Sequence, residues 1–190
     1  SLNNIGLVYQ SSEKYGLALE YYKHSLAIGE ELGKKAEIAG ALSNIGGVYY
    51  VQQKFDQAIE YFRRSIDIIE QLRLTASGDV RRDYLASQID AYQLLIDAAM
   101  RSGSQAEAFN AVEQSKARYL AEKMGEGFSL NKLMFKTAHE IQRDLSPDNA
   151  VLVFANMNLE KPAVFLIGRE GIRAIKVEKR VFVETIGNEY

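Results

Sequence analysis

A segment of about 30 residues occurs twice in this chain, 40 positions apart, and this repeat constrains the fold more than any other feature of the sequence. When residues 2–32 are aligned with residues 42–72, 14 of the 31 positions carry the same residue, too many for chance. Self-similarity at such a period is typical of arrays in which each unit buries its apolar face against its neighbours. The first part of the chain is therefore predicted to be a helical solenoid. Such arrays generally bind other proteins.

Within each copy, the apolar and small residues are spaced as on two amphipathic helices. In the first copy these residues are Leu2, Ile5, Gly6 and Tyr9, followed by Ala18, Tyr22, Ser25 and Ile28. Gly33 is expected to cap the second helix at its C-terminus. In the second copy, helices are predicted over residues 36–52 and 55–73, with a tight turn at Gln53 and Lys54.

The spacing of these residues resembles the tetratricopeptide repeat, whose first helix carries a large residue, then Leu-Gly and a Tyr, and whose second carries Ala, an aromatic residue and Ala. Three departures are present: Leu2 replaces the usual Trp, Ser25 replaces the second Ala, and the unit has 40 residues in place of about 34, without a closing Pro. The resemblance implies an antiparallel helix-pair solenoid whose concave surface binds a peptide or protein. The small residues are expected to let the paired helices approach closely; they are Gly6 and Ala18, then Gly46 and Ala58.

A third, degenerate copy is indicated at an offset of 50 residues from the second. Ala108 and Ser115 repeat the spacing of Ala58 and Ser65. Its first helix is predicted to start after Gly78 and to stop at residues 102–104, and its second to run from about Gln105 to Met124. The predicted solenoid therefore covers residues 1–127, with units at about 1–34, 35–75 and 78–125.

After Gly127 the periodicity changes. Residues 128–149 are predicted to be a linker with one short helix, which begins at a capping box formed by Thr137 and Glu140 and reaches Asp144. Alternating apolar runs then predict three strands of an antiparallel meander, at residues 150–154, 163–167 and 172–177, with a further helix over 181–190. Three strands need a covering layer, so residues 150–190 are expected to be the truncated beginning of an α+β domain. Because residue 1 is not Met, the chain is interpreted as a piece of a longer protein.

A second resemblance spans residues 108–177. It is carried by Glu113, Lys116, Ala117, Arg118 and Leu120, by Ile141 and Gln142, by the turn at residues 145–147, and by the strand at 151–154. This order is similar to the junction between tetratricopeptide repeats and a CHAT domain, a caspase-like peptidase module. Catalysis in that family requires a Cys and a His. The chain has no Cys, and His24 and His139 lie in a repeat helix and in the linker helix, so no catalytic residue is assigned and the chain itself is predicted not to be an enzyme.

Composition excludes several other functions. A formal charge of -2 and a pI near 5.8 argue against nucleic-acid binding, because phosphate affinity requires accumulated Lys and Arg. No apolar run approaches the roughly 20 residues that cross a bilayer, so a soluble protein without membrane contact is expected. The absence of cysteine removes thiolate metal sites and fits a reducing, cytoplasmic compartment. No metal site or cofactor is predicted, and the oligomeric state is left open.

The candidate partner-binding residues lie on the first helix of each copy. Asn4 and Asn44 occupy the position where this family often uses Asn to hydrogen-bond a bound peptide backbone, and an amide can both donate and accept. Asn3, Ser43 and Tyr50 are expected to line the same surface. The alternative is that both Asn residues only stabilise helix packing or face water.

Three functions are consistent with the sequence. The first is a scaffold that binds a peptide or protein through the solenoid. The second is the non-catalytic regulatory front end of a CHAT protease, and the third is an oligomerisation module that pairs exposed strand edges.

Overall fold

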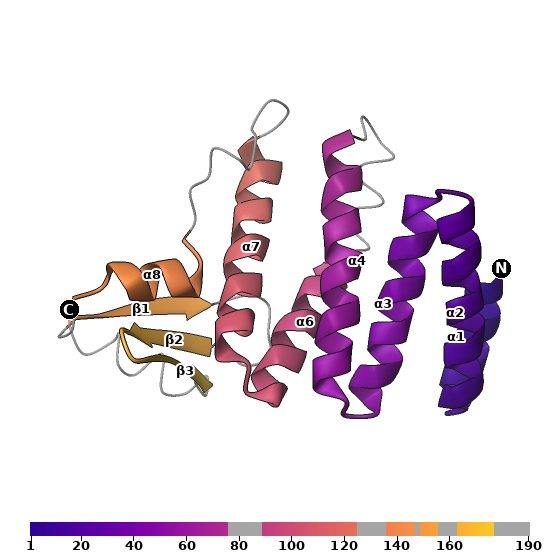
Figure 1. The fold of residues 1–190 in the computed structure, drawn as a ribbon, viewed down its shortest axis with the longest axis horizontal. Coiled ribbons are helices and arrows are strands. Elements are labelled where there is room, and N and C mark those ends of the chain that lie inside the picture. Colours follow the sequence, from indigo (N-terminus) through magenta and orange to yellow (C-terminus); the bar gives the residue numbers. More distant parts are fainter. Residues whose placement is uncertain (76–88, 125–135, 147–148, 156–162, 177–190) are drawn as a thin grey trace. The chain divides into compact units, whose positions relative to one another are not determined.

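The computed structural model of the protein describes residues 1–75, 89–124, 136–146, 149–155 and 163–176. The chain divides into two compact units, Ser1–Ser102 (unit 1) and Gly103–Tyr190 (unit 2). The described part of unit 1 consists of helices, and that of unit 2 combines helices with a three-stranded sheet (Figure 1). The predicted fold class, a helix-pair solenoid followed by a small segment with an antiparallel meander, is confirmed. The predicted domain division at residues 127 and 149 stays a prediction.

Unit 1 stacks its helices in the order in which they occur along the chain. The helices are α1 (Leu2–Ser11), α2 (Tyr15–Glu31), α3 (Lys35–Val51), α4 (Phe55–Thr75) and α6 (Ile89–Ser102). Each packs against the next of these, and α1 also contacts α3, as α3 contacts α6. The first helices of successive pairs therefore line one side of the stack. Residues 78–88, where the third copy was predicted to begin, lie outside the described residues.

Glycine lets the two helices of each pair approach closely, as the sequence predicts. A methyl group placed on Gly6 would lie 2.5 Å from Cε1 of Tyr22, and one on Gly46 would lie 2.8 Å from the ring of Phe62. Both rings are fully buried. The same contact therefore holds α1 to α2 and α3 to α4, 40 residues apart.

Helices α1, α2 and α3 all end in the same hydrogen-bonded turn. After α2, the N–H of Gly33 donates to the carbonyl of Glu30 and the N–H of Lys34 donates to that of Gly29, which is the Schellman pattern. Gly33 takes a φ of 65°, the left-handed conformation that glycine adopts most easily, so its predicted capping role is confirmed. Glu13 and Gln53 occupy the equivalent position after α1 and α3, with φ values of 57° and 60°.

Unit 2 contains α7 (Gln105–Met124), α8 (Ala138–Asp144) and the strands β1 (Ala150–Ala155), β2 (Ala163–Gly168) and β3 (Gly171–Lys176). The sheet has the order β1-β2-β3, and both pairs are antiparallel. Gly168 pairs with Gly171 across a two-residue turn. The predicted meander is therefore present with closely matching strand limits. The helix predicted over residues 181–190 lies outside the described residues.

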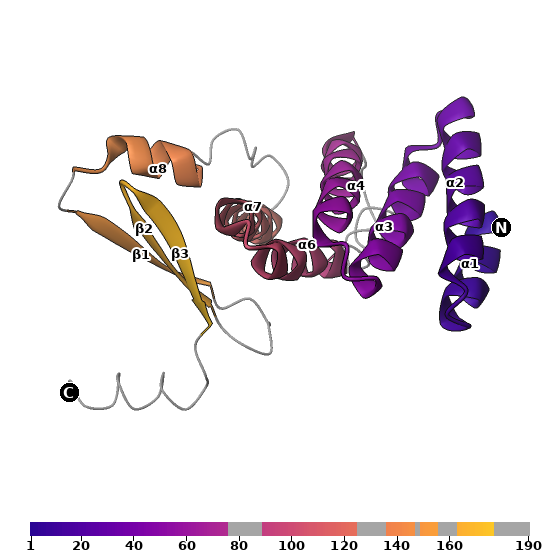
Figure 2. The same cartoon turned by 60° about the horizontal axis from the view of Figure 1, so that its bottom comes forward.

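Helices α7 and α8 both pack on this sheet, and Figure 2 shows α8 lying beside the strands. The buried rings of Phe109 in α7 and Phe165 in β2 meet edge to face, with their centroids 5.6 Å apart. The side chain of Gln105 accepts a hydrogen bond from the N–H of Ala174 at 3.1 Å, and that of Gln142 donates to the carbonyl of Gly168 at 3.2 Å. The three strands thus have the covering layer that a sheet requires, and it is supplied by α7 and α8.

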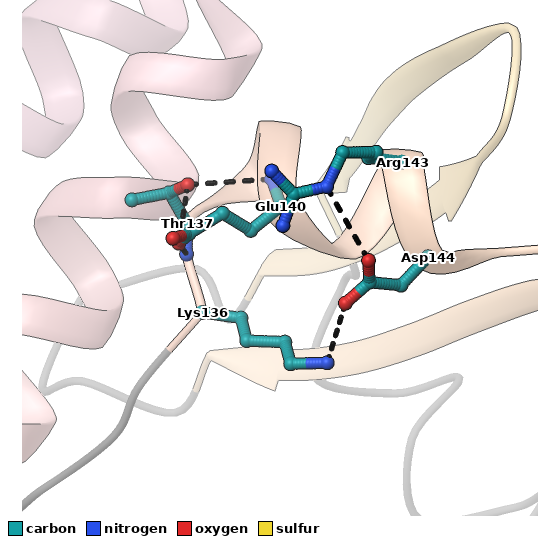
Figure 3. A network of polar contacts seen from close by, with 5 residues as sticks. All are labelled: Lys136, Thr137, Glu140, Arg143 and Asp144. Carbon is teal, nitrogen blue, oxygen red and sulfur yellow. Dashed lines mark hydrogen bonds and ion pairs between the residues drawn. The ribbon is translucent and has the colours of Figure 1, made fainter.

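Helix α8 begins at the predicted capping box (Figure 3). The N–H of Glu140 donates to the Thr137 hydroxyl, and the N–H of Thr137 donates to the Glu140 carboxylate at 2.7 Å. These hydrogen bonds hold the pKa of Glu140 below its usual range. The box satisfies two of the backbone donors that a helix start leaves without partners.

Candidate partner-binding site

Two pairs of residues bring α1 and α3 side by side. A methyl group placed on Gly40 would lie 3.9 Å from Nδ2 of Asn3, and one on Gly47 would lie 4.0 Å from Nε2 of Gln10. Asn3 and Gln10 are seven residues, or two helical turns, apart on α1, and Gly40 and Gly47 are the same distance apart on α3. The lack of side chains at Gly40 and Gly47 therefore leaves the amides of α1 facing the backbone of α3.

Two large apolar side chains remain exposed along the same line. Leu7, which lies between Asn3 and Gln10 on that side of α1, is 45% exposed, and Val51, one turn beyond Gly47 on α3, is 50% exposed. We call this surface the α1–α3 face. It consists of Asn3, Leu7 and Gln10 from α1, and of Gly40, Asn44, Gly47 and Val51 from α3.

The α1–α3 face carries no charged residue of its own. Helix α1 contains no charged side chain at all, and in α3 the last is Glu37, in the first turn. Amide groups and aliphatic side chains are therefore what this surface offers to a ligand. Such groups suit a segment that is apolar and that presents its backbone for hydrogen bonding.

The amides of Asn3 and Gln10 differ in how their polar atoms are satisfied. The buried hydroxyl of Tyr22 donates to Oε1 of Gln10 at 2.8 Å, which fixes that side chain. Oδ1 of Asn3 is buried, and it has no hydrogen-bond partner in the part of the chain that the structure describes. A buried acceptor without a donor is costly, and the partly exposed side chain of Asn3 would gain a donor if it turned its amide toward a ligand N–H.

The predicted pair Asn4 and Asn44 is not equivalent in the structure. Asn4 is exposed, whereas Asn44 is half-buried between Gly40 and Gly47 on the side of α3 that faces α1. Asn4 has the same position on α1, but no preceding helix lies beside it among the described residues. Ser43 is also half-buried.

The fifth predicted residue, Tyr50, joins α3 to α6. Its hydroxyl donates to the carboxylate of Asp97, which also accepts a hydrogen bond from Nε of Arg101 at 2.6 Å. The Arg101 guanidinium lies 5.6 Å from the centre of the Tyr50 ring and 5.8 Å from that of Phe55. Burial and the hydrogen bond to Asp97 raise the pKa of Tyr50, while the hydrogen bond from Arg101 to Asp97 raises the pKa of Arg101. The four groups thus form a cluster that stabilises the contact between α3 and α6.

The sequence interpretation did not include Asp97 and Arg101. The signal was present, because the offset of 50 residues that aligns Ala108 with Ala58 also aligns Asp97 with Gly47 and Arg101 with Val51. The third copy therefore replaces the small and apolar residues of the α1–α3 face with an ion pair. In the row formed by α1, α3 and α6, the charged pair Asp97 and Arg101 therefore lies on α6.

The polar network of α8 has a structural explanation. Lys136 forms an ion pair with Asp144 at 2.6 Å, and Arg143 contacts the same carboxylate at 3.4 Å (Figure 3). The hydrogen bond from Lys136 holds the pKa of Asp144 below its usual range. All three side chains are exposed, so they are the solvated surface of a short capped helix. His24 and His139 are exposed as well, and no group of metal-ligating side chains occurs within the described ranges.

Comparisons with known proteins agree with this architecture. Residues 1–71 match the model of the tetratricopeptide repeat family, so the chain carries tetratricopeptide repeats in its first part. Such repeats generally mediate protein–protein interaction and are typically non-catalytic. A continuation into a CHAT domain is not shown by this match.

Among solved structures, the chain is similar to the crystal structure of BtubC (BKLC) from P. vanneervenii, with a TM-score of 0.54 and 22% sequence identity. The similarity covers 67% of this chain and 48% of that one, so the chain spans about half the length of the protein it matches. At this identity the likeness concerns the fold. No curated protein matches the chain. Among the helices that the structure describes, none combines the length and apolar character of a membrane span.

Proposed function

We propose that this protein is an interaction scaffold whose α1–α3 face binds a peptide or a protein segment. The observation that carries the proposal is the exposure of Leu7 and Val51 on neighbouring helices, beside amide side chains and two glycines. Exposed aliphatic groups beside hydrogen-bonding amides provide both apolar anchoring and orientation. The chain has no cysteine and so offers no thiolate nucleophile, and we place this scaffold in a reducing, cytoplasmic compartment.

The ligand that suits this face is an extended, largely uncharged segment with aliphatic side chains. Asn44 would hydrogen-bond its backbone, and Asn3 would gain the donor that its buried Oδ1 lacks. Asn4 is exposed on α1 outside the face and would hydrogen-bond a ligand that extends past Leu7. Ser43 lies between Gly40 and Asn44 and would border the ligand. Tyr50, fixed by Asp97, would limit the site at the α6 end.

Selection of peptides from a displayed library against the chain, followed by calorimetry, tests the proposal. Leu7→Ser and Val51→Ser are each expected to weaken a selected peptide about tenfold, because an exposed aliphatic anchor is lost. Replacing Asn4 and Asn44 together with Ala should weaken it at least about tenfold, since roughly 1 to 3 kcal/mol is lost when buried hydrogen bonds are not made. Leu17→Ser is the matched control, because Leu17 is 41% exposed on α2 and lies outside the face. Equal losses in Leu17→Ser and Leu7→Ser would contradict the assignment of the face.

A second candidate function is the regulatory front end of a CHAT protease. It is supported by the order of unit 2, in which a capped helix after α7 is followed by an antiparallel meander. The parent reading frame tests this candidate. Downstream His and Cys codons at successive strand ends would support it, and a stop codon directly after residue 190 would remove it.

A further inference from the structure

A buried hydroxyl group holds the side chain of Gln10 in place on the α1–α3 face. The ring of Tyr22 is fully buried and forms one core cluster with Ala18, Ile45 and Val48. Because close packing fixes the ring, it also fixes the position of the hydroxyl group. This hydroxyl donates to Oε1 of Gln10 at 2.8 Å. The core of the first repeat therefore sets the orientation of the Gln10 carboxamide.

The bond from Tyr22 turns the acceptor of this carboxamide toward the core and leaves its donor on the face. A carboxamide accepts through its oxygen and donates through its amino group. A methyl group placed on Gly47 of α3 would lie 4.0 Å from Nε2 of Gln10. Nε2 has no hydrogen-bond partner among the described residues and, unlike Oδ1 of Asn3, it is not sealed from solvent. Gln10 thus offers the α1–α3 face a donor with a fixed direction.

The second copy of the repeat lacks this arrangement. The residues equivalent to Gln10 and Tyr22 are Tyr50 and Phe62, so the buried ring there has no hydroxyl group. The hydroxyl of Tyr50 donates to Asp97 of α6. Phe62 is fully buried in the same place as Tyr22, so packing of the repeat does not require the hydroxyl. The oriented amide is therefore a feature of the first helix pair alone among the two copies.

We propose that Gln10 binds a backbone carbonyl group of the peptide ligand and that Tyr22 is its positioning residue. This contact rests on the proposed function, because its ligand is the peptide of the α1–α3 face. The oxygen of the carboxamide is turned to the core, so the ligand has to supply an acceptor to the amino group. In an uncharged segment every residue offers a backbone carbonyl as that acceptor. Gln10 thereby selects a ligand C=O, and not an N–H, at this point of the face.

The bond from Tyr22 also lowers the entropic cost of binding. A Gln side chain loses rotamer freedom when a ligand fixes it. In this protein folding has already fixed the carboxamide of Gln10, so that cost is not added to ligand binding. Leu7 lies about one turn, or roughly 5 Å, before Gln10 on the same helix and supplies the apolar anchor. The bound carbonyl therefore belongs to a ligand residue one or two positions from the aliphatic anchor, since an extended chain advances about 3.3–3.6 Å per residue.

Calorimetry with the tightest peptide selected from the displayed library tests the contact. In Gln10→Glu the carboxylate accepts but does not donate, so it keeps the bond from Tyr22 and loses the bond to the ligand. This variant should bind the peptide about tenfold more weakly. Tyr22→Phe retains the Gln10 donor but frees its orientation, and a loss of about threefold is expected. Gln57→Glu and Tyr21→Phe make the same chemical changes outside the face, and their affinities should equal that of the parent.

Thiocarbonyl versions of the same peptide identify the group that Gln10 binds, because sulfur is a weaker acceptor than oxygen. One version, modified one or two residues from the aliphatic anchor, should bind the parent about fivefold more weakly. The same version should bind Gln10→Glu with no further loss, since the bond is already absent there. If Gln10 had only a structural role, this sulfur substitution would have the same effect on the parent and on Gln10→Glu.

Side-chain ¹⁵N relaxation of the free chain measures the role of Tyr22 without a peptide. Nε2 of Gln10 should be rigid in the parent and mobile in Tyr22→Phe, and equal mobility would overturn the positioning role. A peptide that is weakened by Leu7→Ser but not by Gln10→Glu would overturn the carbonyl contact and leave the proposed function standing. A selection that yields no peptide sensitive to Leu7→Ser would remove the proposed function and this contact with it.

Discussion

The first helix pair, α1 with α2, and the second, α3 with α4, have almost the same internal structure. Tyr9 stacks on Tyr21 with ring centroids 5.3 Å apart, and Tyr49 stacks on Tyr61 at 5.5 Å. Both pairs also share the contact between a glycine and a buried ring, and the same turn after the first helix. The geometry within a pair is thus determined by residues that the two copies have in common.

The burial of the two pairs is different. Among the described helices, α3 packs against α1, α2 and α6 outside its own pair, whereas α1 packs in this way against α3. The same Ile and Val are consequently in the core in one copy and at the surface in the other. In a repeat array the local sequence specifies the pair, and the neighbouring pair determines how much each residue contributes to stability.

Truncation of the equivalent residues Ile5 and Ile45 to Ala should give the largest difference between the two copies in the free energy of unfolding. Ile45→Ala removes a fully buried side chain and leaves a cavity, with an expected loss of about 3 kcal/mol in the free energy of unfolding. Ile5→Ala removes a side chain that is already 43% exposed, and its cost should stay below about 1 kcal/mol. Urea denaturation followed by circular dichroism measures both values.

An equal loss of stability in the two variants would contradict this prediction. Equal losses for Ile5→Ala and Ile45→Ala would mean that the Ile5 side chain is covered in solution by a second copy of this chain. Self-association would then be seen as a concentration dependence of the urea midpoint.

Replacement of the contact glycines Gly6 and Gly46 by Ala should give a smaller difference in the free energy of unfolding between the two copies. Gly46→Ala places a methyl group 2.8 Å from the Phe62 ring in a helix held on both sides, so a cost of about 2 kcal/mol is expected from overpacking. Gly6→Ala meets the Tyr22 ring at 2.5 Å, but α1 can move outward, and its cost should be about half as large. Gly47→Ala is the control, because its methyl group has 4.0 Å of space and alanine favours the helix by roughly 0.5–1 kcal/mol. A Gly6→Ala protein less stable than Gly46→Ala would show that α1 is as constrained as α3.

The elements that depend on short-range signals were predictable from the sequence. The helix pairs follow from apolar periodicity, the turn at Gly33 from the conformational freedom of glycine, and the start of α8 from the spacing of Thr137 and Glu140. The meander could be predicted because Gly168 and Gly171 separate two alternating runs. Each of these signals acts over a few residues.

The parts that depend on neighbours could not be predicted in this way. Asn4 and Asn44 are each followed by Ile-Gly and lie at the same position of the repeat, so the repeat pattern does not distinguish the exposed residue from the half-buried one. The ion pair of Asp97 and Arg101 was missed because the third copy keeps few of the repeat's residues, and Tyr50 meets it only when α3 packs beside α6. Packing of α7 and α8 on the sheet likewise depends on contacts between residues such as Gln105 and Ala174, 69 positions apart.

The smallest expected difference between the two copies concerns the hydroxyl group of Tyr22, which the second copy lacks because Phe62 takes its place. Burial raises the pKa of Tyr22 to about 12, above the value near 10 of an unfolded chain. The unfolded chain therefore loses this proton first, so the contribution of Tyr22 is complete below pH 10 and is lost as the pH rises from about 10 to 12. Tyr22→Phe should cost about 1 kcal/mol at pH 7, because the hydrogen bond to Gln10 is lost, and should reduce the alkaline loss of stability.

The measurement of this last effect is the difference in unfolding free energy between the parent and Tyr22→Phe, from urea titrations at pH 7, 9 and 10.5. All residues except Tyr22 are the same in the two proteins, so the difference isolates Tyr22, and it should shrink as the pH passes 10. A difference that stays constant with pH would mean that the Tyr22 hydroxyl has the same proton affinity folded and unfolded. Because α1 buries this hydroxyl through Gln10, a constant difference would also indicate that α1 separates from α2 before the rest of unit 1 unfolds.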